Sequence, residues 1–416
     1  MKLLIEQCSS NFQNMLYKIL FGIFIVVILA ALIFGPKALR VYNFIHLFDE
    51  DKISNNFINI NKVFPTTPIA KSKSPHVFVK RAFELPEFYE LDGKTYNLEE
   101  SLDYFKSDGL IVLHKGDLLY ESYWQGNSKD TNHISWSVAK SFLSALIGIA
   151  YHDGLIEDLN DPITKYLKDF IGTGYENVPI RDILQMSSGV VFNEDYADPN
   201  SDINKFARAV AEGTSMRDFA KTLRNGKVPG TFNHYVSIDT QMLGMLLEEV
   251  TGKRLAQSLH EKIWTKIGME NDAYYMVDDT GMEWALGGLN ATLRDYAKFG
   301  LLYLNKGNWE GQQVVPEEWV NASHVADQPH LQPGKNDLSS NDWGYGYQWW
   351  IPGFPDTDYL AAGIYNQYIY IDPVTNVVIA KTSSNYRFNE EREYSKAAHV
   401  AIFRAIANST KGELSP

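Results

Sequence analysis

Cysteine is almost absent from this sequence, and the signatures of two large groups of hydrolases are missing. Cys8 is the single cysteine among 416 residues, so no internal disulfide can form. No cysteine and histidine cluster has the spacing of a zinc site. The pair His260-Glu261 begins an H-E-x-x-H pattern, but Trp264 occupies the position of the second histidine. No G-x-S-x-G motif occurs either, which disfavours an α/β-hydrolase. We therefore expect neither metal catalysis nor a cofactor.

Positive charge is also scarce. The chain has 38 Lys and Arg against 51 Asp and Glu, a net charge of -13, and no basic cluster that would neutralise phosphates. This composition argues against a nucleic-acid partner. Hydrophobic residues make up 45% of the chain, which is enough for the core of one large or two ordinary domains.

One long apolar run lies near the N-terminus. Residues 19–35, ILFGIFIVVILAALIFG, carry no charge and follow Lys18, so they predict a transmembrane helix within residues 1–40 and a lipid bilayer as partner. A cleaved signal peptide is the alternative, although Pro36-Lys37 stands where a cleavage site would be expected. Prolines and polar residues in 41–85 predict an extended tether. We expect a single-pass membrane protein whose domain, 86–412, lies on the extracytoplasmic (periplasmic) side.

The remaining chain alternates between strand-like and helix-like patterns. Gly109–His114 and Asp117–Trp124 flank Lys115-Gly116 and predict a β-hairpin. Helical spacing marks 180–186, 239–250, 255–267 and 293–304. Strand patterns return at 345–351, 358–363, 367–371 and 377–382, before a last helix over 394–407. Early strands, central helices and late strands predict an α+β layered domain with a helical insertion, in which the two ends of the domain share one sheet.

A lysine stands inside the apolar segment HISWSVAKSFLSALIGIAY, residues 133–151. At helical pitch, Lys140 shares one narrow stripe with Ser137, Ser141 and Ser144, while the other directions are apolar. We therefore expect Lys140 to be buried, with stripe hydroxyls as its local partners. Burial would lower its pKa and make it a base one turn from the Ser137 hydroxyl. The alternative is a structural lysine whose amine reaches solvent.

Two further short patterns complete the candidate site. In FNHYVS, Tyr235 and Ser237 form a Y-x-S, in which the phenol could pass a proton to a leaving group and Ser237 could hold the lysine or tyrosine in register. In YLAAGIYNQYI, Gly363 stands in a strand where a substrate could lie against the backbone, and Ile364 then offers its amide.

Taken together, S137-V-A-K140, Y235-V-S237 and A361-A-G-I364, in this order over about residues 85–410, resemble the serine β-lactamase and penicillin-binding-protein superfamily, in particular its class C-like esterases and 6-aminohexanoate-dimer hydrolases. The resemblance implies a β-lactamase-like fold, with a mostly antiparallel sheet flanked by helices and a helical subdomain. It also implies an ester or amide hydrolase without cofactor.

The resemblance also implies roles for individual residues. Ser137 would be acylated, Lys140 would be its base or proton partner, and Tyr235 would shuttle protons to and from the leaving group. The backbone amides of Ser137 and Ile364 would form the oxyanion hole. Tyr196, in the loop FNEDYADP, resembles a substrate-covering tyrosine of the aminohexanoate hydrolases.

Substrate and activity stay open at this point. D-alanyl-D-alanine peptidase or β-lactamase activity is an alternative on the same fold, and a catalytically idle binding module is another. Related β-lactamases and peptidases begin the third motif with lysine or histidine, whereas this chain has Ala361. Since that cation helps to bind carboxylates, we expect small uncharged esters or amides to be preferred, unless another residue such as Lys381 or Arg387 supplies the charge.

Overall fold

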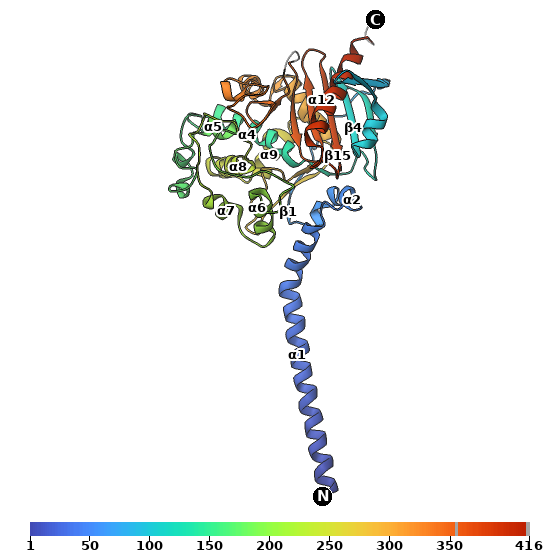
Figure 1. The fold of residues 1–416 in the computed structure, drawn as a ribbon, viewed down its shortest axis with the longest axis vertical. Helices are drawn as coiled ribbons and strands as arrows, with labels where there is room; N and C mark the ends of the chain where they lie inside the picture. Colours follow the sequence, from blue (N-terminus) through green and yellow to red (C-terminus); the bar gives the residue numbers. More distant parts are fainter. Residues whose placement is uncertain (354–356, 413–416) are drawn as a thin grey trace. The chain divides into compact units, whose positions relative to one another are not determined.

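The computed structural model describes residues 1–353 and 357–412, with the exception of the side chains at 2–14, 30, 31, 33, 34, 36, 37 and 412. The chain separates into two compact units, Met1–Leu47 and Phe48–Pro416. Figure 1 labels the main helices and strands along the chain.

The first unit consists mainly of one helix, α1, Lys2–Ile45. The predicted membrane segment, 19–35, lies within this helix, and its side chains at 30, 31, 33 and 34 are outside the described set. Among the residues whose side chains are described, no helix is long and apolar enough to span a membrane. The structure therefore does not support the predicted transmembrane helix.

The second unit combines fifteen strands with eleven α-helices in its described part. The strands are β1 Thr66–Ile69, β2 Phe88–Leu91, β3 Lys94–Asn97, β4 Ser107–His114, β5 Asp117–Tyr123, β6 His133–Ile134, β7 Ala273–Met276, β8 Leu289–Ala291, β9 Asn308–Trp309, β10 Gln312–Gln313, β11 Gly344–Tyr345, β12 Trp350–Ile351, β13 Tyr359–Gly363, β14 Gln367–Asp372 and β15 Val377–Ser383. The helices are α2 Ile53–Phe57, α3 Leu98–Tyr104, α4 Ala139–His152, α5 Ile180–Leu184, α6 Asp202–Ala211, α7 Met216–Thr222, α8 Ser237–Thr251, α9 Leu255–Leu259, α10 Leu293–Leu304, α11 Glu317–Ser323 and α12 Arg392–Ser409.

The main sheet has seven strands in the order β11-β12-β13-β14-β15-β4-β5, and all neighbours are antiparallel. The predicted hairpin is confirmed, because β4 and β5 pair around Lys115 and Gly116, which both have positive φ, as a type I′ turn requires. The prediction that early and late strands share one sheet is also confirmed, since β4 pairs with β15.

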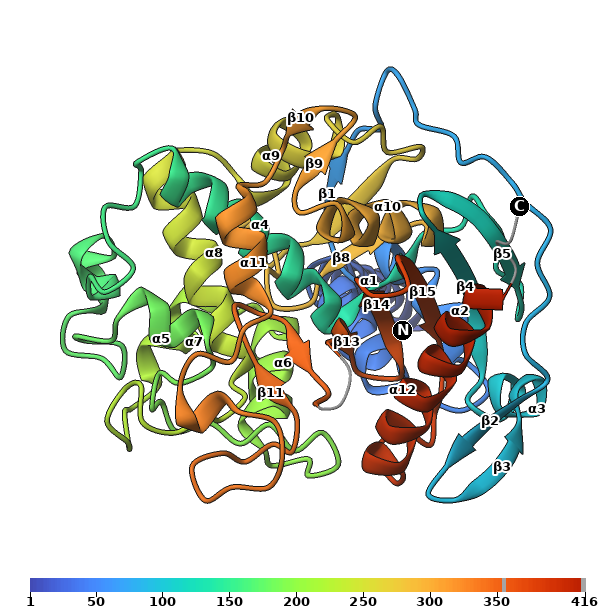
Figure 2. The same ribbon diagram turned by 90° about the horizontal axis from the view of Figure 1, so that it is seen from above.

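Helices cover both faces of this sheet (Figure 2). Alternate residues of a strand point to opposite faces, so Leu110 and Val112 join the core beneath α12. On the other face, α10 crosses β14 and β15, and Gly300 lies so close to Val378 and Ile369 that a Cβ atom there would clash. The α+β prediction is therefore confirmed as a three-layer arrangement.

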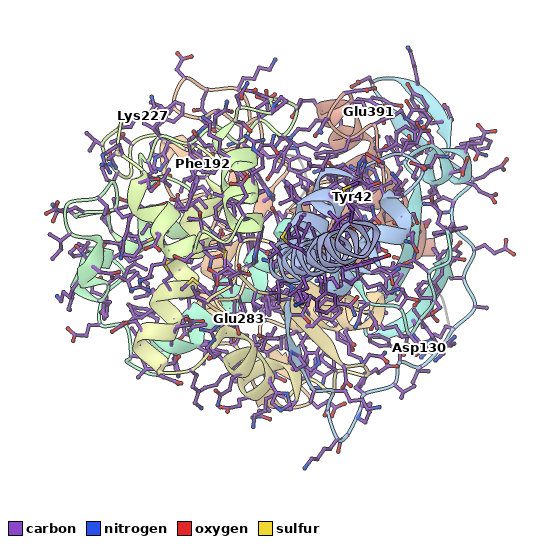
Figure 3. All side chains as sticks on the ribbon, turned by 90° about the horizontal axis from the view of Figure 1, so that it is seen from below. Tyr42, Asp130, Phe192, Lys227, Glu283 and Glu391 are labelled. Carbon is purple, nitrogen blue, oxygen red and sulfur yellow. The ribbon has the colours of Figure 1, made fainter. Side chains whose placement is uncertain are left out.

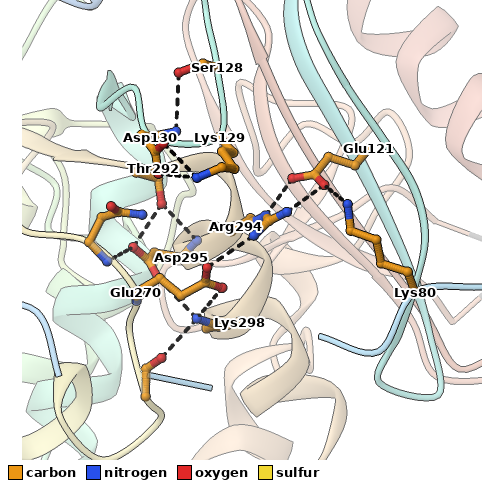
Figure 4. Close-up of polar contacts among 12 residues, drawn as sticks. Lys80, Glu121, Ser128, Lys129, Asp130, Glu270, Thr292, Arg294, Asp295 and Lys298 are labelled. Carbon is orange, nitrogen blue, oxygen red and sulfur yellow. Dashed lines mark hydrogen bonds and ion pairs between the residues drawn. The ribbon is translucent and has the colours of Figure 1, made fainter. Parts of the chain in front are cut away.

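Ion pairs connect α10 to the edge of the sheet (Figure 4). The Arg294 guanidinium donates two hydrogen bonds to the Glu121 carboxylate of β5, at 2.6 and 2.8 Å. One turn later, Lys298 donates to Glu270 at 2.9 Å. The Arg294 bonds hold α10 against β5, and the Lys298 bond holds it against the segment that precedes β7.

A mostly helical subdomain lies beside the sheet. It contains α4 to α9, and Figure 3 labels it at Phe192 and Lys227, with Asp130 and Glu391 on the sheet side. Helix α8 ends one residue beyond the predicted 239–250, where Gly252 caps it in the left-handed conformation. The predicted helix 255–267 is interrupted: α9 ends at Leu259, and residues 260–264 continue as one π-helical turn.

The expectation of an extended tether over 41–85 is wrong for most of that segment. Residues 53–57 form α2, and β1 pairs antiparallel with β7, register Thr66 to Met276. The Pro68 position is compatible with this pairing because β1 is an edge strand of its four-stranded sheet. The apolar residues of this segment that are buried in the second unit include Ile53, Phe57, Ile60, Phe64 and Ile69.

Candidate active site

Ser137 stands at a sharp turn between a short strand and a buried helix. β6 ends at Ile134, the turn Trp136–Val138 is 3₁₀-helical, and α4 begins at Ala139. Trp136 has a φ of +45°, a strained conformation that tight surroundings must hold. Phe57 and Phe48 supply part of those surroundings, with ring centroids 5.5 and 5.7 Å from that of Trp136. The segment 48–57 therefore supports the turn that presents Ser137.

Helix α4 is buried as its apolar surface predicts. Its stripe serines do not bind Lys140, however: Ser141 and Ser144 each donate at 2.7 Å to the backbone oxygens of Gln348 and Tyr347. The expectation that stripe hydroxyls would be the partners of the lysine is wrong for these two. Their bonds instead fix α4 against the strand region that precedes β12.

Lys140 is 1% exposed and donates two hydrogen bonds. Its Nζ donates to the Leu286 carbonyl oxygen at 2.8 Å and to Ser237 Oγ at 3.2 Å. Burial lowers its pKa to about 7, although Glu194 and Asp239 act in the opposite direction. An amine with this pKa is substantially unprotonated at neutral pH and can accept a proton.

Tyr235 lies beside Ser137 and Lys140. Its ring stacks on Trp350, with centroids 5.3 Å apart, and the Lys140 Nζ lies 5.4 Å from the ring centroid. Burial and then Glu194 raise the pKa of the Tyr235 phenol, while a hydrogen bond with Ser137 lowers it. The net direction is upward, so the phenol keeps its proton in the resting site and can serve as an acid.

Gly363 brings the end of β13 against the Ser137 backbone. A Cβ atom at Gly363 would lie 2.6 Å from the Ser135 oxygen and 3.1 Å from the Ser137 amide nitrogen, so only glycine fits. Ile364 follows, at the start of a turn in which Tyr365 and Asn366 have positive φ. Ser137 and Ile364 also line the same cavity, which is compatible with the predicted pair of oxyanion-hole amides.

The predicted residues converge on one small cavity of about 40 Å³. It is lined by Ser137, Tyr196, Tyr235, Trp343, Trp350, Ala362, Gly363, Ile364, Tyr368, Phe388, Arg392 and Lys396. Of the predicted site residues, Lys140 and Ser237 are absent from the lining, because they lie buried behind Ser137 and Tyr235. The structure thus brings all three sequence motifs together.

Sequence reasoning missed three charged residues of this site. Arg392 and Lys396 line the cavity from α12, so the premise that it lacks a cation is wrong, and neither Arg387 nor Lys381 lines it. Two cations one turn apart resemble an ordinary solvated helix face, which explains why they gave no signal. Glu194, 8% exposed, accepts hydrogen bonds from Tyr196 and Ser237. It stands in an acid-rich loop, where burial alone distinguishes it from its neighbours.

Comparison with known proteins agrees with this geometry. The family model described as "Beta-lactamase" matches residues 97–402. The 6-aminohexanoate-dimer hydrolase of Paenarthrobacter ureafaciens is 30% identical over 79% of this chain and 84% of its own. A solved structure from Bacillus anthracis, provisionally named as a 6-aminohexanoate-dimer hydrolase, superposes with a TM-score of 0.77 at 27% identity, over 86% of this chain and 95% of that one. The teichoic acid D-alanine hydrolase of Staphylococcus aureus is 22% identical over 60% of this chain and 59% of its own. The chain is a serine hydrolase of the β-lactamase family.

Proposed function

We propose that this protein cleaves esters or amides of small molecules through an acyl-enzyme on Ser137. The observation that carries the proposal is the convergence of Ser137, Tyr235 and the Ile364 backbone on one cavity, with the Lys140 amine directly behind it. Nucleophile, base, acid and oxyanion donors are the groups that acyl transfer needs.

Each step uses a group whose state the environment favours. Lys140, with its lowered pKa, accepts the Ser137 proton as Ser137 Oγ bonds to the substrate carbonyl carbon. The amides of Ser137 and Ile364 donate to the resulting oxyanion. Tyr235 gives its proton to the leaving alkoxide or amine as the carbonyl–leaving-group bond breaks, and the proton on Lys140 restores the phenol. A water then attacks the acyl group by the same route in reverse.

The relatives support a small amide or ester as substrate. One is named for hydrolysis of a dimeric amino acid, 6-aminohexanoate, and another for hydrolysis of D-alanine from teichoic acid. Peptidase or β-lactamase activity remains the second candidate on this fold, and Arg392 in the cavity is the feature that favours it.

Ser137→Ala tests the nucleophile, because the lost hydroxyl is small and the fold should survive. We expect a fluorophosphonate probe to label wild-type protein once, with the adduct mapped to Ser137 by mass spectrometry, and to leave Ser137→Ala unlabelled. Wild-type protein that resists the probe and turns over no ester, amide, peptide or β-lactam would instead identify an idle binding module. The soluble form should begin near residue 48, since 48–57 supports Trp136.

We also propose that α1 anchors the protein in a lipid bilayer, with the catalytic unit on the extracytoplasmic side. Support comes from the apolar residues of 19–29, among which Phe21, Phe24 and Val26 are each at least 60% exposed. Carbonate extraction of membranes from cells that express the full chain tests the anchor, and protease treatment of spheroplasts tests the side. Release of the full-length chain by carbonate would contradict anchoring, and a shorter N-terminus would indicate cleavage.

A further inference from the structure

Glu194 is a buried carboxylate that the proposed reaction does not use directly. It accepts three hydrogen bonds from two residues: the Tyr196 hydroxyl at 2.6 Å, the Ser237 amide at 3.0 Å, and the Ser237 hydroxyl. Two of these contacts reach Oε1 and the third reaches Oε2, so both carboxylate oxygens are used. A neutral side chain of the same shape could not accept all three, since an amide has a single oxygen.

The Ser237 hydroxyl has one hydrogen, and it donates this hydrogen to the Glu194 carboxylate. The lone pairs of Ser237 Oγ are then left to face Lys140 Nζ, which donates to that oxygen and to the Leu286 carbonyl. A neutral lysine amine has two hydrogens, and both are used by these acceptors. Its lone pair is the one position that remains for the Ser137 proton.

If the Ser237 hydroxyl were free to turn, it could donate its proton to the Lys140 lone pair. The base would then be occupied by a hydrogen bond from its own neighbour and would be unable to accept from Ser137. Glu194 prevents this orientation, because a carboxylate is the stronger acceptor for a hydroxyl proton.

Charge around Lys140 points to the same residue. The ionisable groups that act on it are Glu194, from the loop before α6, and Asp239, on α8, and the Tyr235 phenol faces it as well. Burial raises the pKa of Asp239 to about 8, so that carboxyl is mostly neutral at pH 7, and the phenol also stays protonated. Of these groups, Glu194 has the largest effect in favour of the protonated Lys140 amine.

We propose that Glu194 is a positioning residue for the general base. Through Ser237 it keeps the Lys140 lone pair available to Ser137. Through its hydrogen bond with Tyr196 it also fixes the position of one residue that lines the cavity. This inference rests on the proposed function, since it assigns Glu194 to the reaction of Ser137. It predicts two separable effects of Glu194, one on the rate and one on the pH at which the base becomes active.

The test is the pH dependence of fluorophosphonate labelling of Ser137 in the full chain, measured as a second-order rate constant. In Glu194→Gln we expect labelling at high pH to be about tenfold to a hundredfold slower, because the base is misoriented. We also expect the midpoint of the rise in rate to move down by about one pH unit, since an opposite charge near an amine favours its protonated form. A merely structural role would lower the rate without moving the midpoint.

Two further variants keep the inference open to refutation if Glu194→Gln is poorly folded. Glu194→Asp retains the charge but has a shorter reach, so it should slow labelling and leave the midpoint in place. Ser237→Ala removes the link, so Glu194→Gln should cost little more rate in that background than Ser237→Ala alone. Additive losses, or an unchanged midpoint in Glu194→Gln, would overturn the proposal.

Asp358→Asn is a matched control, because Asp358 is a buried carboxylate that accepts from Tyr370 and Arg404 outside the cavity. It should alter stability and leave the labelling midpoint unchanged; a shift like that of Glu194→Gln would overturn the assignment to Glu194. Absence of labelling at Ser137 in wild-type protein would contradict the proposed function itself. Labelling of Ser137 with a pH profile indifferent to Glu194 would contradict only this inference.

Discussion

Removing the positive charge of Arg392 should change which substrates the protein prefers. Arg392 lines the cavity with Ser137, and no carboxylate within residues 1–353 and 357–412 forms an ion pair or hydrogen bond with its guanidinium. The expected preference for uncharged substrates rested on Ala361, and Arg392 gives a reason to expect the opposite preference.

The size of the effect follows from the kind of contact. A hydrogen bond to a charged group contributes about 1.5–3 kcal/mol, and each 1.4 kcal/mol corresponds to a factor of ten. Arg392→Gln should therefore lower kcat/KM for an acyl donor with a terminal carboxylate by about tenfold to a hundredfold. Lys396 contributes less, because burial lowers its pKa and Glu393 pairs with it at 3.0 Å.

Two 4-nitrophenyl esters of similar chain length provide the assay: the neutral pentanoate and the half-ester of adipic acid, which carries a free carboxylate. The ratio of their kcat/KM values cancels the influence of Arg392 on Tyr235, which affects both esters. Arg387→Gln is the matched control, since its guanidinium contacts Tyr104 and Tyr386 outside the cavity. An equal loss for both esters in Arg392→Gln, or an unchanged ratio, would refute the reasoning.

Three further predictions concern the buried lysines. Lys140→Arg should be nearly as inactive as Lys140→Ala, because a guanidinium stays protonated and cannot accept the Ser137 proton; steady-state ester hydrolysis measures this, and an arginine variant with most of the wild-type kcat would show a purely electrostatic role. In wild-type protein, kcat/KM should rise with pH around a midpoint near 7, as Lys140 loses its proton. Ionisation of Tyr235 should cause no decline in kcat/KM below about pH 10, because the pKa of that phenol is raised. A stopped assay from pH 5 to 10 checks both limbs, and a rate that falls across pH 6–8 would contradict the role of Lys140 as base. Lys381→Met should stabilise the fold near pH 7, because it removes a buried amine that has no hydrogen-bond acceptor among the described residues, and denaturant unfolding measures the change.

Local patterns predicted the elements of the sheet because their causes are local. The hairpin at Lys115-Gly116 follows from two residues with positive φ, and the alternation in β4 and β5 follows from the pleat. The predicted strand 345–351 is broken into β11 and β12, because Gln348 has a φ of +63° and turns its amide inward to Thr240 and Leu184. Nothing in the composition of that segment indicates such a buried polar contact.

The site was predictable in part for the same reason. Ser137, Lys140, Tyr235 and Gly363 stand in short motifs whose spacing is fixed within one element. Glu194 acts across 43 residues on Ser237, and its partners become visible only after the chain folds. The composition around Phe57 predicts a tether, although its ring lies 5.4 Å from that of Tyr365. An apolar residue in a polar segment carries no signal of what it packs against.

Lys381 shows that a lowered pKa by itself does not identify a catalytic base. Like Lys140, it is 1% exposed, and burial lowers its pKa to about 7. No side chain or carbonyl in the described part of the chain accepts a hydrogen bond from its Nζ, and it is absent from the cavity lining. The ionisable groups near it are Asp108 and His399. Burial of this amine should therefore destabilise the fold without serving the reaction.

The pH dependence of unfolding tests whether burial of the Lys381 amine destabilises the fold. The unfolded chain holds the Lys381 proton up to its usual pKa of 10.5, whereas the folded state releases it near pH 7. The unfolded state thus binds more protons between these values, and the contribution of Lys381 to stability improves as pH rises through that window. Each unit of pKa shift corresponds to about 1.4 kcal/mol, so Lys381→Met should raise the free energy of unfolding by about 2–4 kcal/mol near pH 7 and by much less at pH 10, with activity retained. A methionine variant that is less stable at pH 7, or whose advantage is the same at both pH values, would show that the Lys381 amine is stabilised by contacts that its surroundings do not reveal.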